Sequence, residues 1–282
     1  SDPGSESYNG MQAQVKHPAG HGLMLMANYA YSHAFTNRYI GDYYTSDEAI
    51  TNFTTLRDRH LSRAPSPYDQ RHTFRAYATY DLPFKPANRW AREAASGWTL
   101  SPIFTWQKGR NFKMLGGTNT YNYNDNYANQ PDVSDSGVVL NGITTKQLQK
   151  AVGYYPGPNT STPRLLMNPS VFANGQVLPE TTPGQLGQFI YLTGPQYINT
   201  DFAVTKVFPI FEQLKLNIQA EMLNLFNHPA WSVVDGYSGG TNNPAQYVNV
   251  QNTPAAPGAQ TNPEGLNSGG ARDIQFRAQL QF

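Results

Sequence analysis

Seven stretches of the sequence alternate between apolar and polar residues, and this alternation restricts the fold more than any other feature. In residues 274–282, apolar residues alternate with Gln275, Arg277, Gln279 and Gln281. A period of two places successive side chains on opposite faces of a β-strand. The strands predicted in this way cover residues 8–16, 22–35, 74–82, 98–106, 198–208, 214–222 and 274–282.

The connections between these strands alternate in length. The long ones follow the second, fourth and sixth strands and cover about residues 36–70, 110–196 and 227–271. Consecutive antiparallel strands place successive connections at opposite ends of a sheet, so all the long connections lie at one end. Short periplasmic turns with long extracellular loops are typical of outer-membrane barrels. The predicted fold class is therefore all-β, a transmembrane antiparallel β-barrel represented by about its last seven strands. A soluble β-sandwich is the alternative.

The composition agrees with strands joined by polar connections. Only 14% of the residues are charged, whereas 13% are aromatic, and many of the rings stand near predicted strand ends, as membrane interfaces favour. The net charge is +1 without a basic cluster, which argues against nucleic acid as a partner. The sequence has no cysteine, so disulfides, thiolate nucleophiles and Cys-ligated metals are excluded.

Six segments resemble a known family: "SYNGMQAQVKHPAGHGLMLMANYAYSHAF", "DQRHTFRAYATYDLPF", "GWTLSPIFTWQKGRNF", "LTGPQYINTDFAVTKVF", "LKLNIQAEMLNLFNHPAW" and "RDIQFRAQLQF". They are similar to the C-terminal part of the barrel of Oar-like TonB-dependent outer-membrane receptors. These receptors are common in Acidobacteria and carry a carboxypeptidase-regulatory-like domain before the plug. "AEMLNLFNHP", at residues 220–229, is the most specific piece. The resemblance implies ligand uptake across the outer membrane, driven through a TonB partner.

Compared with that family, the sequence lacks the N-terminal domain, the TonB box, the plug and the first barrel strands. We therefore expect residues 1–282 to be the C-terminal part of one barrel domain, with the missing part before Ser1 and not after Phe282. The implied partners are outer-membrane lipid, the missing plug and strands, the TonB complex and the barrel assembly machinery. Neither enzymatic activity nor a cofactor is expected. A surface adhesin, a structural β-rich assembly protein and a passive porin remain alternatives.

The segment "TNTYNYNDNYANQPDVSDSG", residues 118–137, is the candidate for ligand binding. Aromatic platforms beside amide groups suit a saccharide or a peptide, and Asp125, Asp132 and Asp135 offer oxygens that calcium prefers. The alternative is a polar loop without a ligand. The candidate ligand-binding residues are Tyr121, Tyr123, Asn124, Asp125 and Tyr127.

The polar faces of the last two strands supply a second set of candidates. In a complete receptor these side chains would face the lumen and the plug, with hydrogen bonds rather than chemistry as their role. The terminal aromatic residue, Phe282, resembles the signal that the outer-membrane assembly machinery recognises. The lumen-facing candidates are Lys215, Asn217, Gln219, Glu221, Gln275 and Arg277.

Two weaker motifs point to other chemistry. "GYSGG", residues 236–240, matches the G-x-S-x-G of a hydrolase, but it has neither the preceding strand nor the following helix that a nucleophile elbow requires. "RDRH", residues 57–60, could ligate a metal together with Asp69 and His72. Loop polar residues that anchor one another are the favoured interpretation of this second group.

Overall fold

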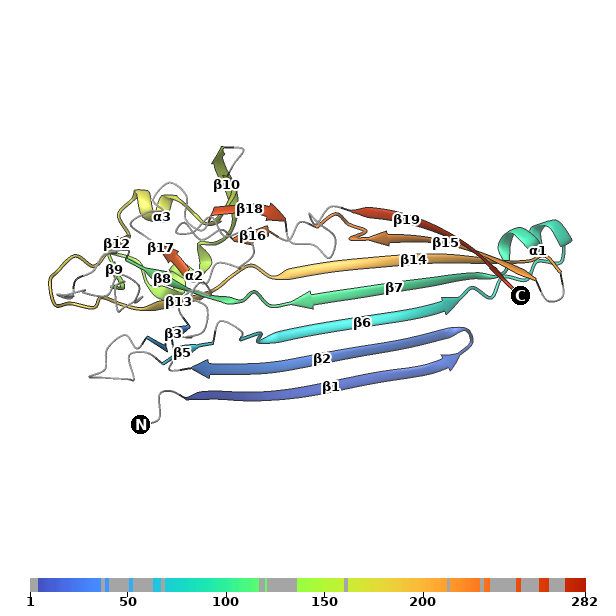
Figure 1. Cartoon of the computed structure of the whole chain (residues 1–282), viewed down its shortest axis with the longest axis horizontal. Coiled ribbons are helices and arrows are strands. Elements are labelled where there is room, and N and C mark those ends of the chain that lie inside the picture. The colour runs from blue at the N-terminus through green and yellow to red at the C-terminus, as the bar shows by residue number, and fades with distance from the viewer. Residues whose placement is uncertain are drawn as a thin grey trace.

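Seven long strands form one antiparallel sheet in the computed structural model, in the order β1-β2-β6-β7-β14-β15-β19 (Figure 1). They are β1 (Glu6–Gly20), β2 (Leu23–Thr36), β6 (His72–Asp81), β7 (Trp98–Gln107), β14 (Tyr197–Pro209), β15 (Lys215–Leu223) and β19 (Asp273–Gln281). The structure describes residues 5–36, 39–40, 51–52, 63–66, 69–116, 120, 136–159, 162–211, 214–228, 231–233, 247–249, 259–263 and 272–282. All seven predicted strands are confirmed, and we call their sheet the wall.

The first hairpin is longer than the sequence suggests. The prediction ends the first strand at Lys16, but β1 continues to Gly20, with a shift of register between His17 and Gly20. The turn is only His21–Gly22, and both residues have positive φ, at 52° and 81°. Pro18 is tolerated because it lies within this register shift, where the regular ladder with β2 is already interrupted.

Pro102 lies inside β7, and the neighbouring ladders show how the sheet accommodates it. The ladder with β14 pairs Phe202 with Pro102. The ladder with β6 pairs Tyr77 with Ile103 and resumes at Tyr80 and Leu100, so it is interrupted beside the proline. The strand therefore continues through Pro102 at the cost of local pairing with one neighbour.

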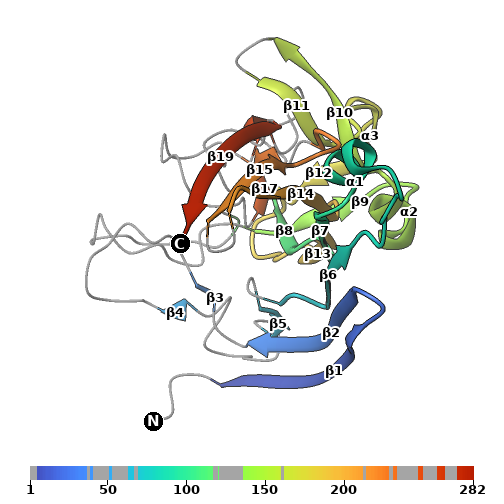
Figure 2. The same cartoon turned by 90° about the vertical axis from the view of Figure 1, so that its right-hand side faces the viewer.

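The two faces of the wall differ in polarity. Met11, Val15, Ile218 and Phe276 share one face by register, and they are 58%, 66%, 40% and 80% exposed. Large apolar patches of this kind are rare on water-soluble proteins. The strands follow an arc, and α1 (Arg89–Ala95) lies outside it (Figure 2). Lys206 of the apolar face contacts α1, so the apolar face is the convex one.

The connections at the two ends of the wall differ as predicted. The short-turn end holds the two-residue β1–β2 turn, α1 and the β14–β15 connection (Figure 1). The other end holds the short strands β3 (Tyr39–Ile40), β4 (Thr51–Asn52) and β5 (Ala64–Pro65), and the longest connection.

The longest connection, predicted as a loop over residues 110–196, is a folded unit that we call the lobe. It consists of β8 (Asn111–Leu115), β9 (Val138–Leu140), α2 (Thr145–Lys150), β10 (Val152–Asn159), β11 (Thr162–Met167), α3 (Ser170–Ala173), β12 (Val177–Pro179) and β13 (Ile190–Thr193). Three strands of the last long connection pair with it or with one another: β16 (Trp231–Val233), β17 (Tyr247–Asn249) and β18 (Ala259–Pro263).

The lobe has its own hydrophobic core. Its strands are too short and its helices too brief to give a periodic signal in the sequence, so pattern analysis missed it. The core residues are Phe112, Met114, Val138, Leu148, Leu166, Met167, Val171, Phe172, Val177, Ile190 and Leu192. None of the helices in the described ranges is both long and apolar enough to cross a membrane.

Candidate functional site

The polar face of β15 and β19 brings the predicted lumen residues together. The ladder pairs Gln219 with Arg277 and Glu221 with Gln275, and it places both pairs on the face opposite Ile218. Lys215 and Asn217 lie on the same face, opposite Gln281 and Gln279. The six candidates thus form one patch that carries both signs of charge and many amide groups. Such a patch can hydrogen-bond a partner, but it has no arrangement for covalent chemistry.

The other strands extend this polar face with residues that the sequence did not single out. Asn199 donates to Asp201 at 2.9 Å, and the backbone N–H of Asn224 donates to the same carboxylate at 2.8 Å. Near the opposite edge, Gln14 donates to Asn28 at 2.7 Å. Period two would have identified Gln14, Asn28, Asn199 and Asp201, because each occupies the polar phase of its strand, whereas Asn224 lies in the turn after β15.

Apolar groups interrupt the polar face in β2, β6 and β7. Ile103 is 48% exposed there. The Tyr77 hydroxyl beside it in the ladder donates to the Met26 sulfur at 2.9 Å. This face is therefore suited to contact with protein as well as with water.

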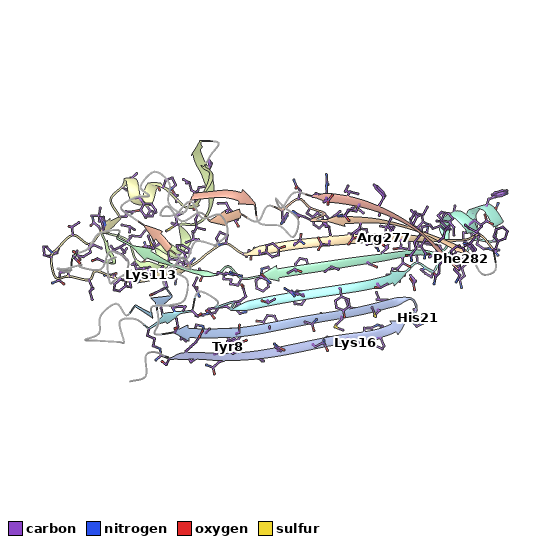
Figure 3. All side chains as sticks on the ribbon, viewed as in Figure 1. Tyr8, Lys16, His21, Lys113, Arg277 and Phe282 are labelled. Atoms are coloured by element: carbon purple, nitrogen blue, oxygen red, sulfur yellow. The ribbon has the colours of Figure 1, made fainter. Side chains whose placement is uncertain are left out.

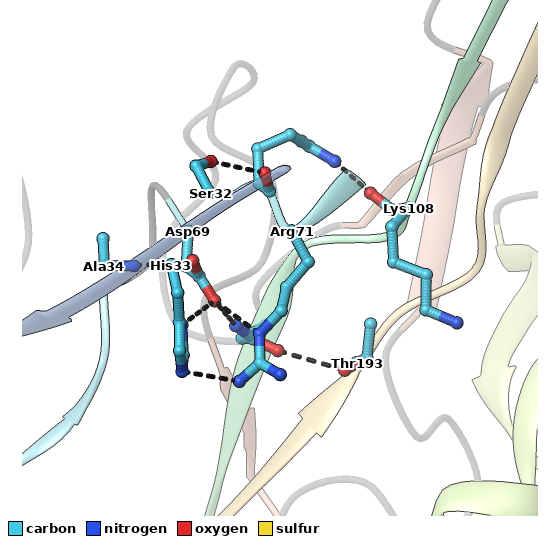
Figure 4. Close-up of polar contacts among 9 residues, drawn as sticks. Ser32, His33, Ala34, Asp69, Arg71, Lys108 and Thr193 are labelled. Atoms are coloured by element: carbon cyan, nitrogen blue, oxygen red, sulfur yellow. Dashed lines mark hydrogen bonds and ion pairs between the residues drawn. The ribbon is translucent and has the colours of Figure 1, made fainter. Parts of the chain in front are cut away.

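Asp69 ties the first long connection to the wall and the lobe (Figure 4). Its side chain is fully buried, and one oxygen accepts the backbone N–H of Ala34 at 2.8 Å. The other oxygen lies 3.1 Å from His33 Nδ1, 3.3 Å from Arg71 Nε and 3.0 Å from Asn111 Nδ2. Arg71 has only donors, so its contact with His33 Nε2 at 2.8 Å places the imidazole proton on Nδ1. We call this group the Asp69 cluster.

His72 belongs to a different environment from Asp69. Its Nδ1 lies 2.7 Å from the Tyr29 hydroxyl, and its ring centroid lies 6.1 Å from that of Trp106. Asp69 thus anchors residues of β2 and β8, and it does not share a site with His72. In the described ranges no three His, Cys, Asp or Glu side chains are grouped as metal ligands. Residues 57–60 lie outside those ranges.

The lobe holds two groups with shifted pKa values. Hydrogen bonds from Thr182, chiefly from its backbone N–H at 2.8 Å, lower the pKa of Glu180 below its ordinary range. Burial raises the pKa of Tyr191 to about 12. Lys113, labelled in Figure 3, pairs with Tyr191 in the β8–β13 ladder and lies 4.1 Å from the centre of the Phe189 ring. The shift of Glu180 thus comes from local hydrogen bonds, and that of Tyr191 from burial in the lobe.

The predicted ligand-binding residues Tyr121, Tyr123, Asn124, Asp125 and Tyr127 lie outside the described residues. The same holds for Asp132, Asp135 and residues 236–240. The two flanks of the first segment are described, and they meet: the backbone N–H of Thr120 donates to the Ser136 hydroxyl at 3.2 Å, and both residues are buried. The two described residues that flank this segment therefore lie side by side in the lobe.

The family model for "Outer membrane beta barrel domain" matches residues 1–275. The chain belongs to this outer membrane beta barrel family. Its apolar convex face is consequently the lipid-facing surface, and the bacterial outer membrane is its location. The predictions of fold class and location are confirmed.

Two further comparisons complete the findings. A solved structure similar to the chain is that of the outer membrane transporter YddB from Escherichia coli, with 8% identity and a TM-score of 0.43. The similarity covers 99% of this chain and 26% of that one, so the chain spans about a quarter of the transporter. No curated protein matches the chain.

The barrel family accounts for two groups of apolar side chains. Rings on the lipid-facing surface gather toward the lobe end of the strands, where Tyr31 lies 5.2 Å from His72 and Phe74 lies 6.0 Å from Phe104 between ring centroids. This is the position of an interfacial aromatic girdle. An open cavity of about 600 Å³ near the short-turn end is lined by the lipid-facing residues Leu23, Tyr80, Leu100 and Phe202, among others. Its position makes it part of the lipid surface.

Two residues at the short-turn end complete the candidate site. Phe282 follows β19 there and is 92% exposed (Figure 3), which leaves it accessible to a partner. Its role as an assembly signal stays a prediction. Sequence analysis did not identify Lys206 as a functional residue. The signal was present, because Lys206 is a basic residue in the apolar phase of its strand, between Val204 and Phe208.

Proposed function

We propose that the chain is the C-terminal part of the barrel of an Oar-like TonB-dependent receptor, which takes up a ligand across the outer membrane. The observation that supports this most is a combination of two features. The concave polar face of the wall carries both signs of charge, and a folded lobe lies at one end of the same wall. The lobe has the rigidity that ligand capture needs, because its own core positions its surface. The concave face has the donors and acceptors to hold a plug.

The edges of the wall support the same proposal. Within the described residues, β1 pairs only with β2, and β19 pairs only with β15. Unsatisfied backbone groups in hydrocarbon cost several kcal/mol each. We therefore infer that further strands of the same protein pair with β1 and β19 and close the barrel.

The mechanism follows from the two faces. The lipid-facing surface fixes the wall in the membrane, while the patch around Glu221 and Arg277 holds the plug in the closed state. A pull from TonB on the plug would break these exposed polar contacts one by one, at a small cost each, because water replaces them. The ligand would pass from the lobe along the opened polar face.

Ion conductance in planar bilayers tests this proposal without knowledge of the ligand. The complete protein in potassium chloride should show little steady conductance, and moderate urea should open it reversibly by releasing the plug. Steady conductance without urea would instead favour a passive porin. The protein should also bind the periplasmic domain of TonB in a pull-down, and an adhesin should not.

A pair of variants tests whether the patch contacts the plug. Arg277→Glu should increase conductance without urea, because it reverses a charge that faces the plug. Phe276→Leu, one residue away on the lipid-facing surface, is the matched control and should conduct like the wild type. Equal conductance of both variants and the wild type would contradict a plug contact at this patch.

A further inference from the structure

The helix α1 at the short-turn end lies on the lipid side of the wall. It belongs to the connection between β6 and β7, outside the arc of strands (Figure 2). Lys206, which is 3% exposed, reaches it from the lipid-facing surface of β14. The ammonium group donates to the carbonyl oxygens of Glu93 at 2.7 Å and Ala94 at 3.1 Å, and also to that of Ser96.

Several further contacts fix the position of this helix. Asn88 caps the N-terminus by accepting from the backbone N–H of Trp90 at 2.9 Å. At the other end, Trp98 Nε1 donates to Ala94 O at 2.8 Å, and the Lys206 charge complements the negative end of the helix dipole. A helix of seven residues is marginal in water by itself. These contacts therefore hold α1 in a defined place rather than leave it as an ordinary turn.

Large apolar side chains around α1 point away from the described part of the chain. Trp90 is 78% exposed, Phe84 56% and Phe211 73%. Phe208, beside Lys206, is also exposed. This surface continues the lipid-facing surface of the wall beyond the ends of its strands. Exposed rings of this size are unfavourable in water, so a medium that covers the wall should cover them as well.

The charge of the same segment indicates which medium this is. Residues 84–95 contain three basic residues, Lys85, Arg89 and Arg92, and one acidic residue, Glu93, which gives a net charge of +2. Tryptophan beside basic residues is typical of the boundary between lipid headgroups and acyl chains. Phosphate groups complement the charge, and the acyl boundary accommodates the rings.

We propose that α1 and its flanking rings insert into the headgroup boundary of the periplasmic leaflet and bind glycerophospholipid there. Lys206 is the positioning residue, because it holds the helix against the lipid-facing surface. The occupant is the lipid that surrounds the barrel. This inference rests on the location in the outer membrane and is independent of TonB-driven transport.

Fluorescence quenching by brominated phospholipids tests the proposal. The complete protein is folded into vesicles of phosphatidylethanolamine and phosphatidylglycerol, with bromine either near the headgroup or near the acyl end. The difference between the wild type and Trp90→Phe isolates the emission of Trp90. We expect shallow bromine to quench this emission more than deep bromine, and aqueous acrylamide to quench it weakly.

Trp106→Phe is the internal control, because Trp106 lies on the lipid-facing surface toward the lobe end and its emission should be quenched by lipid in any case. Quenching of Trp106 without quenching of Trp90 would overturn the proposal, since α1 would then face water or a protein partner. Stronger quenching of Trp90 by deep bromine would also overturn it.

Lys206→Met tests the positioning role. This substitution keeps the aliphatic stem but removes the donors to the helix carbonyls. We expect the Trp90 emission to lose quenching by shallow bromine and to gain quenching by acrylamide, whereas Lys215→Met, on the polar face, should change neither. Unchanged Trp90 quenching in Lys206→Met would show that Lys206 does not position the helix. The Trp90→Phe comparison in the wild-type background does not depend on how well Lys206→Met folds.

Discussion

The wall and the lobe use apolar side chains in opposite ways. On the wall, Phe276 is 80% exposed and Ile218 is 40% exposed, whereas Met114 and Leu148 of the lobe are fully buried. The wall presents its apolar surface to lipid and satisfies its backbone through long ladders. The lobe excludes water by packing side chains from eight short elements around one centre. One chain thus contains one region that folds in contact with lipid and another that folds in water.

The two regions meet at the Asp69 cluster. His33 and Ala34 belong to the wall, and Asn111 opens the lobe. A fully buried carboxylate with four hydrogen-bond partners holds β2, the first long connection and the lobe together. This contact is more specific than apolar packing would be, because each donor must be correctly placed. This junction and the contrast between the regions lead to four predictions, given from the largest expected effect to the smallest.

Truncation in the lobe core should unfold the lobe and leave the wall intact. Phe112→Ala removes a ring that is 3% exposed and should destabilise the lobe by about 3 to 5 kcal/mol, through lost burial and the remaining cavity. Hydrogen exchange in membranes would show fast exchange in β8 to β13 and slow exchange in the wall. Phe112→Leu is the matched control and should cost less than about 1.5 kcal/mol. Simultaneous loss of protection in both regions would contradict their independence.

A charge on the wall should be costly on one face only. Val204→Arg places a guanidinium toward lipid near the middle of β14 and should cost about 2 to 4 kcal/mol. Ala203→Arg, one residue earlier, points to the polar face opposite Glu221 and should cost little. Urea unfolding in vesicles would measure both. Equal tolerance of the two arginines would show that the assignment of faces is wrong.

Weakening the Asp69 cluster should loosen the junction. Asp69→Asn removes the charge that His33 and Arg71 share. It should destabilise this junction, which we call the rim of the wall, by about 1 to 3 kcal/mol. The rate of hydrogen exchange should rise at Ala34 and Asn111 before it rises in the lobe core or in the ladders of the wall. Asp81→Asn at the short-turn end, where the carboxylate accepts from Thr99, is the control and should leave the rim unchanged. Slow exchange at the rim in Asp69→Asn would argue against this role.

High pH should destabilise the lobe alone. The pKa of Tyr191 is raised from 10.0 to about 12, so its stabilising contribution is present below pH 10 and is lost as the pH rises toward 12. The expected loss is about 2 kcal/mol. Urea unfolding of the lobe at a series of pH values would reveal it. Tyr191→Phe cannot ionise and should show a flatter profile over this interval, and identical profiles would exclude Tyr191 as the cause.

The prediction from sequence succeeded where a local rule applied. Alternation located all seven strands of the wall and assigned Gln219 and Arg277 to one face. It failed at residues 17–20, because Pro18 was taken to end the strand, whereas β1 accommodates this proline in a shift of register. It also failed at residues 110–196, where short elements carry no period and composition suggested a loop.

The sequence by itself determined the strands, their two faces and the end at which the long connections lie. Each of these follows from residues that are neighbours in the chain, because a period of two acts over a few positions. Only the tertiary structure decided the lobe core, the Asp69 cluster and the position of α1 against the wall. Lys206 and the carbonyl of Glu93 are 113 positions apart, and Asp69 is 42 positions from Asn111. Contacts over such separations depend on how the whole chain packs, and no local pattern in the sequence specifies them.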